Sequence, residues 1–280
     1  MIPIRHLTAG AHRLALDRTL VMGIVNVTPD SFSDHGRHAA SAAAIAHARR
    51  LIGEGADIID IGGESTRPGA RDVDEAEELR RVIPVLEQLA GSGTPVSVDT
   101  RKPAVMRAAI AAGASMINDV SALRAPGAID ALAQSNAAVC LMHMQGEPAT
   151  MQQNPVYRDV ISEVRAFLAD RVAACRAAGI GDERIVIDPG VGFGKTLEHN
   201  LALVSGLREF ERLGLPILVG ISRKGTLGTL TGRPVGERMP ASIAAALAAV
   251  ARGAAIVRVH DVAATVDALA VWRAIERDGK

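Results

Sequence analysis

Short apolar runs that end on a polar residue or a glycine recur eight times along the chain, and a stretch of helical character follows each of them. The run endings are residues 25–28, 61–64, 96–100, 117–120, 141–143, 186–190, 220–224 and 257–261. Repeated strand-then-helix units are typical of parallel strands joined by crossover helices. Eight such units predict a closed (β/α)8 TIM barrel, in which the strand ends converge on the face where active sites lie.

The same pattern sets the expected bounds of the elements. The predicted strands cover residues 20–27, 57–62, 95–99, 116–120, 138–143, 185–188, 216–221 and 256–260. The clearest predicted helices cover residues 41–54, 74–90, about 155–178, 241–250 and 263–277. Loose alternation over residues 12–16 and a turn at Asp17-Arg18 predict a short N-terminal hairpin that closes the barrel bottom.

Three of the predicted strand-to-helix connections are long, at residues 28–40, 64–73 and 144–154. Most connections in α/β proteins have about 2–6 residues, and longer ones are often functional. The first two are rich in Pro, Gly, Ser and charged residues. Because they leave the carboxyl ends of strands, we expect them to close over a substrate rather than to be ordinary surface loops.

Length and composition agree with one barrel. The 280 residues match the roughly 250 residues usual for this fold, and the chain shows no domain boundary, so we expect a single domain over residues 1–280. Hydrophobic residues make up 48% of the chain and aromatic residues only 2%. A core of Ala, Leu, Ile and Val is typical of parallel strands that are buried on both faces.

Charge and cysteine usage narrow the class of protein. With 31 basic and 31 acidic residues and a formal net charge of +0, the chain offers no electrostatic basis for binding nucleic acid or an anionic membrane. The first residues lack the apolar stretch of a signal peptide, and no apolar run reaches the roughly 20 residues of a membrane span. The two cysteines, Cys140 and Cys175, lack C-x-x-C spacing. We therefore expect reduced structural thiols in a cytoplasmic protein.

The last predicted strand carries a candidate anion site. Alternation along the strand places Arg258 and His260 on the same side, and a helix that begins near Val262 adds N–H donors and a positive dipole end. The loops after the seventh and eighth strands of such barrels often bind phosphate. We therefore predict a polyphosphate site here, the alternative being a surface arginine and a capping histidine. Asn26 ends the neighbouring first strand, and its amide oxygen is a candidate ligand for Mg2+.

Other strand ends carry candidate ligands for a flat heterocycle. Asp99, Asn118 and Asp188 end the third, fourth and sixth predicted strands. Carboxylates in a barrel mouth are costly to desolvate unless they are paired or hydrogen-bonded. Two carboxylates and an amide that converge on one pocket fit a ring with several N–H groups, such as an aminopyrimidinone. Lys224, after the seventh strand, would pair with such a carboxylate or donate to the ring.

Several familiar sites are excluded by spacing. Residues 190–196 read GVGFGKT, but the phosphate-binding motif G-x-x-x-x-G-K-[ST] requires glycine where this chain has Pro189. That loop more plausibly shapes the pocket, with Phe193 as an apolar wall. His143 has no His, Asp or Glu cluster at metal-ligand spacing. Nucleophile signatures such as G-x-S-x-G and a Ser-His-Asp set are also missing.

Six segments, in the expected order, resemble the dihydropteroate synthase family over nearly the whole chain. They are residues 22–34, 62–70, 117–121, 188–195, 220–224 and 258–261. The resemblance implies a TIM barrel that joins 6-hydroxymethyl-7,8-dihydropterin pyrophosphate to p-aminobenzoate and releases pyrophosphate. It also implies a magnesium ion and a homodimer. The family commonly has Asp-Gly-Gly where this chain has Asp34-His35-Gly36, a departure that concerns the first long loop.

The resemblance further implies roles for individual residues. Asp99, Asp188, Lys224, Arg258 and His260 would carry the catalysis. The pterin pyrophosphate would contact Thr66, Asp99, Asn118, Asp188, Lys224, Arg258 and His260, with Asn26 near the diphosphate and on Mg2+. The p-aminobenzoate would contact Phe32, Thr66, Arg67, Pro68, Phe193, Ser222 and Lys224.

Three other functions remain open on the sequence. A methyltransferase that acts on a corrinoid protein would share the Asp and Asn pterin ligands but would not need Arg258 and His260. An aldolase would use Lys224 as a Schiff-base lysine beside Arg223. A pterin-binding protein without activity would keep the same polar positions, and pyrophosphate release on mixing both substrates with Mg2+ would distinguish it from an enzyme.

Overall fold

The computed structural model describes residues 5–27, 36–65, 69 and 72–278. Eight strands form a closed barrel in the order β10-β3-β4-β5-β6-β7-β8-β9, and every neighbouring pair is parallel. The strands are β3 (Leu20–Asn26), β4 (Ile58–Gly62), β5 (Val96–Asp99), β6 (Met116–Asp119), β7 (Ala138–Met142), β8 (Ile185–Asp188), β9 (Ile217–Val219) and β10 (Ala254–Val259). The predicted (β/α)8 barrel is confirmed.

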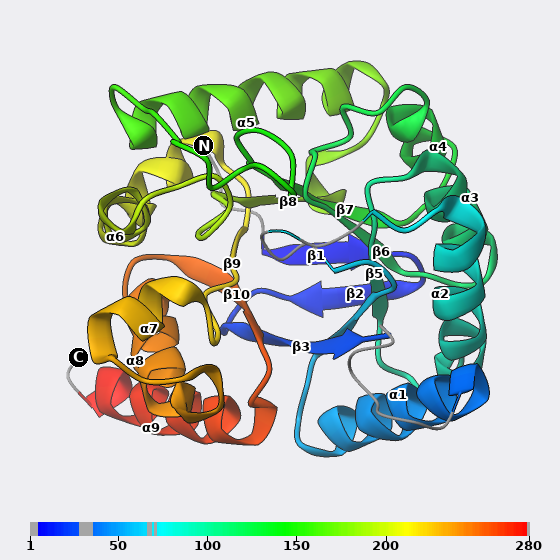
Figure 1. The fold of residues 1–280 in the computed structure, drawn as a ribbon, viewed down its shortest axis with the longest axis horizontal. Helices are drawn as coiled ribbons and strands as arrows, with labels where there is room; N and C mark the ends of the chain where they lie inside the picture. Colours follow the sequence, from blue (N-terminus) through cyan, green and yellow to red (C-terminus); the bar gives the residue numbers. More distant parts are fainter. Residues whose placement is uncertain (1–4, 28–35, 66–68, 70–71, 279–280) are drawn as a thin grey trace.

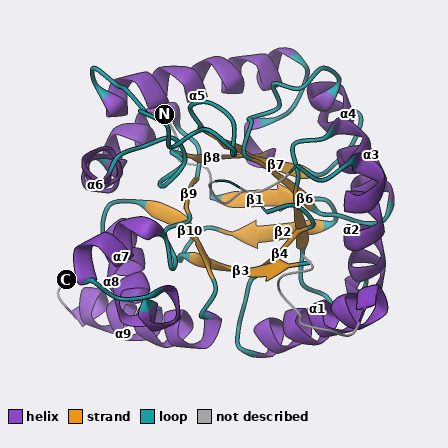
Figure 2. Ribbon diagram, viewed as in Figure 1, coloured by secondary structure: helices purple, strands orange, loops and turns teal. Residues whose placement is uncertain are grey.

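Helices surround the barrel, as Figure 1 and Figure 2 show. They are α1 (Gly36–Gly53), α2 (Glu75–Leu89), α3 (Pro103–Ala111), α4 (Ala128–Ala133), α5 (Val160–Ala177), α6 (Leu197–Ser205), α7 (Gly225–Thr231), α8 (Met239–Val250) and α9 (Val262–Asp278). Short 3-10 helices cover Asp182–Arg184 (η2), Leu207–Leu213 (η3) and Val235–Glu237 (η4). Among the described residues, no helix combines the length and apolar character that a membrane crossing requires.

Period-two alternation along the strands separates the core into an outer and an inner part. Ile59 and Ile61 on β4 and Val98 on β5 pack outward, in the large cluster that the helices cover. Ile58 on β4 and Met116 on β6 point inward and fill the barrel interior with apolar side chains. The inward positions nearer the carboxyl ends are polar, so the polar residues lie above an apolar floor.

The N-terminal hairpin closes the barrel bottom, as predicted. Strands β1 (His6–Ala9) and β2 (His12–Ala15) pair antiparallel, and Leu7 and Ala9 are buried among the inward-facing apolar residues of the barrel. Figure 1 shows the hairpin within the ring of strands. The chain bends at Asp17-Arg18, as predicted, but the turn that joins the two hairpin strands lies elsewhere. The chain turns at Gly10, whose φ of 58° is easily reached only by glycine, whereas Arg18 pairs with Asp57 across 2.5 Å.

Some element bounds also differ from the prediction. Helix α5 begins at Val160 rather than near residue 155, because the Asp159 carboxylate accepts hydrogen bonds from the backbone N–H groups of Ile161 and Ser162 and caps the helix there. Helix α1 begins at Gly36, five residues before the predicted Ser41. Both cysteines are free and buried, as structural thiols are expected to be.

Candidate active site

Three of the predicted site residues lie in one register layer of the barrel. Asn26 on β3 pairs with Gly62 on β4, Gly62 pairs with Asp99 on β5, and Asp99 pairs with Asn118 on β6. The residues that precede them on three of these strands, Ile61, Val98 and Ile117, belong to the outer core. Because alternate residues face opposite sides, Asp99 and Asn118 face the barrel interior, where both are almost completely buried.

The guanidinium of Arg258 on β10 reaches two carboxylates in the barrel interior. Its Nε donates to Oδ2 of Asp60 at 2.6 Å, and its Nη2 donates to Oδ2 of Asp99 at 2.9 Å. The amide of Asn118 donates to the same Oδ2 of Asp60 at 3.1 Å. One hydrogen-bonded network therefore joins residues of β4, β5, β6 and β10.

The charges of this network are unbalanced, because two carboxylates share one guanidinium. Burial raises the pKa of the Asp99 carboxyl to about 7, an effect that Arg258 opposes and Asp60 reinforces. For Arg258, burial lowers the pKa, but the attraction of Asp60 and Asp99 outweighs it and the pKa is raised. The cluster can therefore accept further N–H donors or positive charge at its open side.

Asp188 at the end of β8 faces the same interior. Burial raises the pKa of its carboxyl, while the positive charges of Lys224 and Arg258 lower it. Its Oδ1 accepts a hydrogen bond from the backbone N–H of Gly190 at 2.7 Å. Gly190 has a φ of 71°, and a Cβ there would lie 1.9 Å from the carbonyl oxygen of His143, so only glycine fits. Asp188 and Arg258 thus lie close enough in the barrel interior to interact electrostatically.

Lys224 lies directly before α7, in the connection that follows β9. Its Nζ donates to the carbonyl oxygen of Val191 and lies 4.4 Å from the centroid of the Phe193 ring. Burial lowers the pKa of Lys224 to about 8, and Asp188 acts in the opposite direction. Lys224 and Phe193, both predicted to line the aminobenzoate pocket, therefore lie in contact.

His260, which follows β10, contacts Ser222 after β9. Its backbone N–H donates to Ser222 Oγ at 3.2 Å, and its Nδ1 lies 3.0 Å from the same oxygen. Between Ser222 and Lys224, Arg223 has a φ of 58°, an unusual value for a residue with a side chain. An ion pair from Arg223 to Asp261 holds that conformation. Helix α9 begins at Val262, as expected for a helix N-terminus beside the anion site.

Lys195 was not predicted as a site residue, yet it is a buried cation behind the site. Its Nζ lies 2.9 Å from Nδ1 of His143, and it donates to the carbonyl oxygen of Phe193 at 2.9 Å. Burial lowers the pKa of Lys195 to about 7, against the attraction of Asp188. Burial together with Lys195 lowers the pKa of His143 to about 3, so this imidazole is neutral. These contacts fix the loop that carries Phe193.

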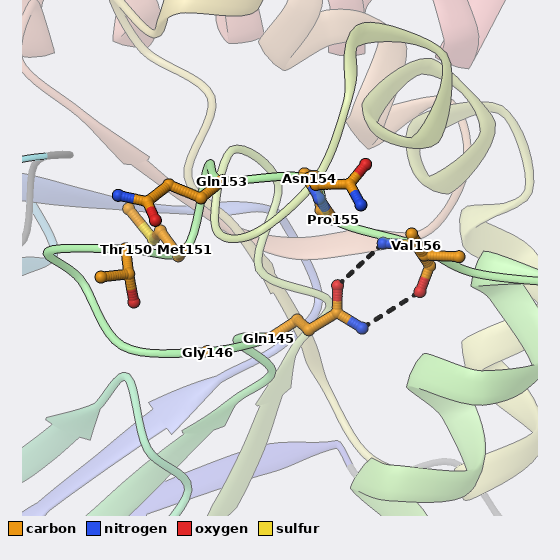
Figure 3. A pocket seen from close by; sticks show the side chains of 8 residues that line it. All are labelled: Gln145, Gly146, Thr150, Met151, Gln153, Asn154, Pro155 and Val156. Carbon is orange, nitrogen blue, oxygen red and sulfur yellow. Dashed lines mark hydrogen bonds between the residues drawn. The ribbon is translucent and has the colours of Figure 1, made fainter.

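The described long loop after β7 is tied to the loop after β8. The Gln145 amide exchanges two hydrogen bonds of 3.1 Å with the backbone of Val156, which Figure 3 shows. Gln152 donates to the carbonyl oxygen of Gly192 at 2.8 Å. A cavity of about 370 Å³ opens within this loop, lined by residues 145, 146, 150, 151 and 153–156. It contains none of the predicted site residues, which lie at the strand ends instead.

A charged network supports the end of β4 from outside. Glu64 accepts from Lys102 at 2.6 Å, and Lys102 also contacts the buried Glu78 at 2.5 Å. Arg101 contacts Asp72 at 2.8 Å and Glu147 at 3.3 Å, so it joins the loops after β4 and β7.

Four predicted site residues lie outside the described residues: Phe32, Thr66, Arg67 and Pro68. The same holds for His35, for residues 28–35 of the first long loop, and for residues 66–68 and 70–71 of the second. The predicted closing role of these two loops therefore stays a prediction.

Asp60 is the second site residue that the sequence interpretation missed. It lies in the middle of a strand, and the prediction considered only strand ends. A signal was present, since Asp60 is the single charged residue in the apolar run Ile58-Ile59-Asp60-Ile61. Alternation with Ile59 and Ile61, which face outward, places it in the barrel interior.

The arrangement can bind a planar, N–H-rich group and a polyanion side by side. Asp99, Asn118 and Asp188 supply acceptors and a donor in the interior, while Arg258 and Lys224 supply positive charge. Within the described part of the chain, no three His, Cys, Asp or Glu side chains gather as they would around a protein-held metal ion. Among the site residues described above, Ser222 Oγ and His260 Nδ1 form a contact of 3.0 Å between a hydroxyl and an imidazole.

Comparisons with known proteins show the family of this chain. The model of the family described as "Pterin binding enzyme" matches residues 22–260. A dihydropteroate synthase of Neisseria meningitidis serogroup B is 55% identical over 274 residues, which are 95% of this chain and 96% of that protein. The dihydropteroate synthase of Escherichia coli is 50% identical over 262 residues, 93% of each.

Solved structures give the same result. A dihydropteroate synthase of Xanthomonas albilineans with 4-aminobenzoic acid has a TM-score of 0.92 and 55% identity, covering 97% of this chain and 98% of that one. A dihydropteroate synthase of Burkholderia cenocepacia, complexed with 7,8-dihydropteroate, has a TM-score of 0.90 and 51% identity, covering 100% and 99%.

Proposed function

This chain belongs to the pterin-binding enzyme family, and from that premise we propose that it catalyses the dihydropteroate synthase reaction. It condenses 6-hydroxymethyl-7,8-dihydropterin pyrophosphate with p-aminobenzoate to give 7,8-dihydropteroate and pyrophosphate. The observation that supports this most directly is that Asp188 and Arg258 lie close enough in the barrel interior for the positive charge of Arg258 to lower the pKa of Asp188. A pterin needs acceptors for its N–H groups, its diphosphate needs positive charge, and the barrel mouth supplies both.

We propose that Asp99, Asn118 and Asp188 bind the pterin ring. Their side chains are buried in the barrel interior, where a hydrogen bond to a carboxylate is stronger than in water because solvent does not compete. Lys224 is near enough to attract Asp188 electrostatically, and it would donate to a ring carbonyl or nitrogen. Arg258 would lie against the ring, since it is already held in the interior by Asp60 and Asp99.

The diphosphate would lie toward β10 and the start of α9. Arg258 supplies the guanidinium, His260 is oriented by Ser222, and the helix N-terminus at Val262 supplies N–H donors. Thr66 would add a hydroxyl from the second long loop. Together these groups would stabilise the charge that builds on the departing pyrophosphate.

Asn26 fits the magnesium ion that the family implies. Mg2+ keeps several waters and is often bound through few protein oxygens plus substrate phosphates, and Asn26 presents one amide oxygen in the same register layer as Asp99. When bound, the ion would neutralise charge on the diphosphate. Activity lost on addition of EDTA and restored by Mg2+ would support this role, whereas full activity in EDTA would refute it.

The chemistry is substitution at the pterin CH2 group. The carbon–oxygen bond to the diphosphate breaks, the amine nitrogen of p-aminobenzoate forms the new bond, and the nitrogen loses its proton. A dihydropterin can delocalise positive charge from that carbon, so bond breaking can run ahead of attack, and Asp99 and Asp188 would stabilise the resulting cation. An aromatic amine is unprotonated at neutral pH, so no strong general base is required, and the proton that the nitrogen loses after attack can pass to water or to the departing pyrophosphate.

We propose that the p-aminobenzoate lies against Phe193. Lys224 Nζ lies over the Phe193 ring, and Ser222 contacts His260, so both residues would border the same pocket. Phe32, Arg67 and Pro68 would complete this pocket from the two long loops. Closure of those loops would exclude water from the cation.

We also propose a cytoplasmic homodimer. The described surface has an exposed apolar group on α7, η4 and α8, namely Leu230, Val235 and Met239, which are 53%, 55% and 42% exposed. Contiguous exposed apolar side chains often mark a subunit interface. Sedimentation equilibrium would give twice the mass of one chain, and a monomer at micromolar concentration would refute the proposal.

The decisive experiment is a coupling assay with both substrates and Mg2+, with pyrophosphate release and dihydropteroate formation measured together. The wild-type chain should form both products in equal amounts. Asp188→Asn should weaken pterin binding and slow turnover. An Asp188→Asn variant with unchanged pterin affinity and full turnover would refute its role, and a wild type that releases no pyrophosphate would refute the function.

A further inference from the structure

Asp60 is the most deeply buried acidic residue of the site, and it lies below the residues proposed to bind substrate. It is 0% exposed and lies one inward position before Gly62 on β4. Its register partner on β5 is Ser97, two residues before Asp99. The apolar floor of the barrel, which includes Ile58 and Met116, lies below it. Asp60 therefore lies between the floor and the substrate layer.

Both contacts of Asp60 lead upward to residues proposed to bind the pterin. One oxygen, Oδ2, accepts from Arg258 at 2.6 Å and from Asn118 at 3.1 Å. A carboxylate that accepts from two groups at once restricts both rotamers. Without it, the Arg258 guanidinium would keep one hydrogen bond, to Asp99, and could swing about that single contact.

Stability does not explain why a carboxylate occupies this position. The second oxygen, Oδ1, has no hydrogen-bond partner among the described residues, and a buried acceptor left unpaired costs stability. The cluster also holds two carboxylates against one guanidinium. An Asp99–Arg258 pair alone would be balanced in charge. The carboxylate of Asp60 is therefore better explained by a role in the reaction than by a role in stability.

We propose that Asp60 is a positioning residue of the reaction, which fixes Arg258 and Asn118 in their substrate-binding orientation and, through its charge, makes Asp99 a better acceptor. This inference rests on the proposed function, because it assigns Arg258 and Asn118 to the pterin substrate. Asp60 itself contacts no substrate in this arrangement, since Arg258 and Asn118 lie between them.

The charge of Asp60 acts on Asp99 in a way that a purely steric role would not. The charged groups that act on Asp99 electrostatically are Arg258 from β10, Lys224 after β9, Asp60 from β4, Glu78 from α2 and Asp119 from β6. Arg258 lowers the pKa of Asp99, and the three acidic groups raise it. Loss of the Asp60 charge removes one of the raising effects. The pKa of Asp99 should then fall, and the acid limb of the pH profile should move to lower pH.

The test is Asp60→Asn, with Ser97→Ala as the matched control. Ser97 is the register partner of Asp60, is equally buried, and does not touch Arg258 or Asn118 in the described network. Loss of a charge-assisted hydrogen bond costs about 1.5–3 kcal/mol, a factor of roughly 10–150 in kcat/KM. We expect a loss of this size in kcat/KM for the pterin substrate and little change in KM for p-aminobenzoate.

Three further readouts separate positioning from a structural role. The acid limb of kcat/KM should shift to lower pH in Asp60→Asn and stay in place in Ser97→Ala. The melting temperature of Asp60→Asn should be equal to or above that of the wild type. In the double variant Asp60→Asn/Arg258→Lys, activity should resemble that of Arg258→Lys alone, because a mispositioned Arg258 and a replaced one lose the same contact.

Each contrary result overturns the proposal. Full activity of Asp60→Asn, an unmoved acid limb, or a melting temperature lower by more than about 5 °C would assign Asp60 to stability or to no role. Calorimetric titration with 6-hydroxymethyl-7,8-dihydropterin and with pyrophosphate tests the same contacts without turnover. If the wild type binds both ligands but forms no product, the proposed function is refuted. If Asp60→Asn binds them as tightly as the wild type does, the positioning role is refuted.

Discussion

Removal of the guanidinium in Arg258→Met should destabilise the protein in a pH-dependent way. Arg258 is the cation that contacts both Asp60 and Asp99, and Met has a similar volume. Its loss leaves two carboxylates buried beside each other without their counter-charge. Breaking a buried pair from one side costs about 3–5 kcal/mol. For a chain of this size, that corresponds to a loss of about 6–15 °C in melting temperature.

The pH dependence gives the sharper test. Arg258 lowers the pKa of Asp99, which is about 7 with the guanidinium present, so the pKa rises further in the variant. A carboxyl whose folded-state pKa exceeds the unfolded value contributes stability at low pH that is lost as pH rises through the folded pKa. The deficit of Arg258→Met should therefore be small at pH 5 and large at pH 8.5.

Differential scanning fluorimetry at pH 5, 7 and 8.5 would measure this, with Arg233→Met as the control. Arg233 is 64% exposed in its ion pair with Glu237, and an exposed pair contributes little. Its variant should melt within about 1–2 °C of the wild type at each pH. If Arg258→Met loses the same melting temperature at pH 5 as at pH 8.5, the electrostatic reasoning is refuted.

Three further outcomes follow from the buried groups. The profile of kcat/KM against pH for the pterin substrate should be bell-shaped, with limbs near pH 7 and pH 8. The reason is that Asp99 (pKa about 7) must be ionised and Lys224 (pKa about 8) protonated in the free enzyme. A profile that is flat from pH 6 to 9 would contradict this. In the folded wild type, Lys195 is neutral above its lowered pKa of about 7. The stability of the wild type relative to Lys195→Met should therefore rise as the pH increases from 7 to 10. Melting temperatures of the two proteins that change with pH in the same way would contradict this. Phe210→Ala removes a wholly buried ring from the outer core and should lower the free energy of unfolding by about 3–5 kcal/mol in urea titrations, while an unchanged urea midpoint would show that the site collapses without cost.

The fold was predictable because the period of the apolar residues and the order of the strands and helices indicate it. Most barrel strands are aliphatic runs, and a polar residue or a glycine, such as Asp99, Asp188 or Gly62, ends the run. The bend at Asp17-Arg18 was predictable from its turn-like residues, whereas the turn that joins the two hairpin strands lies at Gly10, which has the backbone freedom that this turn needs. The start of α5 was misplaced because the Asp159 cap was passed over in favour of Pro155.

The partners within the site were less predictable than its members. Arg258 was expected to meet an anion, but its contacts with Asp60 and Asp99 require its side chain to reach past β3 to β4 and β5, and sequence spacing does not give that geometry. Lys195 was passed over because its segment was considered as a rejected phosphate loop and as a pocket wall formed by Phe193. Its burial against His143 arises from the packing of two loops far apart in sequence.

The link between Arg258 and Asp60 joins residues 198 positions apart, and this has a consequence for synthesis. A ribosome releases β4 and β5 with their acidic side chains long before β10 emerges. Until then the nascent chain carries Asp60 and Asp99 without the cation that neutralises them, and β3 has no β10 to pair with. Barrel closure and charge neutralisation therefore both wait for β10, so a chain truncated before β10 should have an open barrel and should keep Asp60 and Asp99 without their cation.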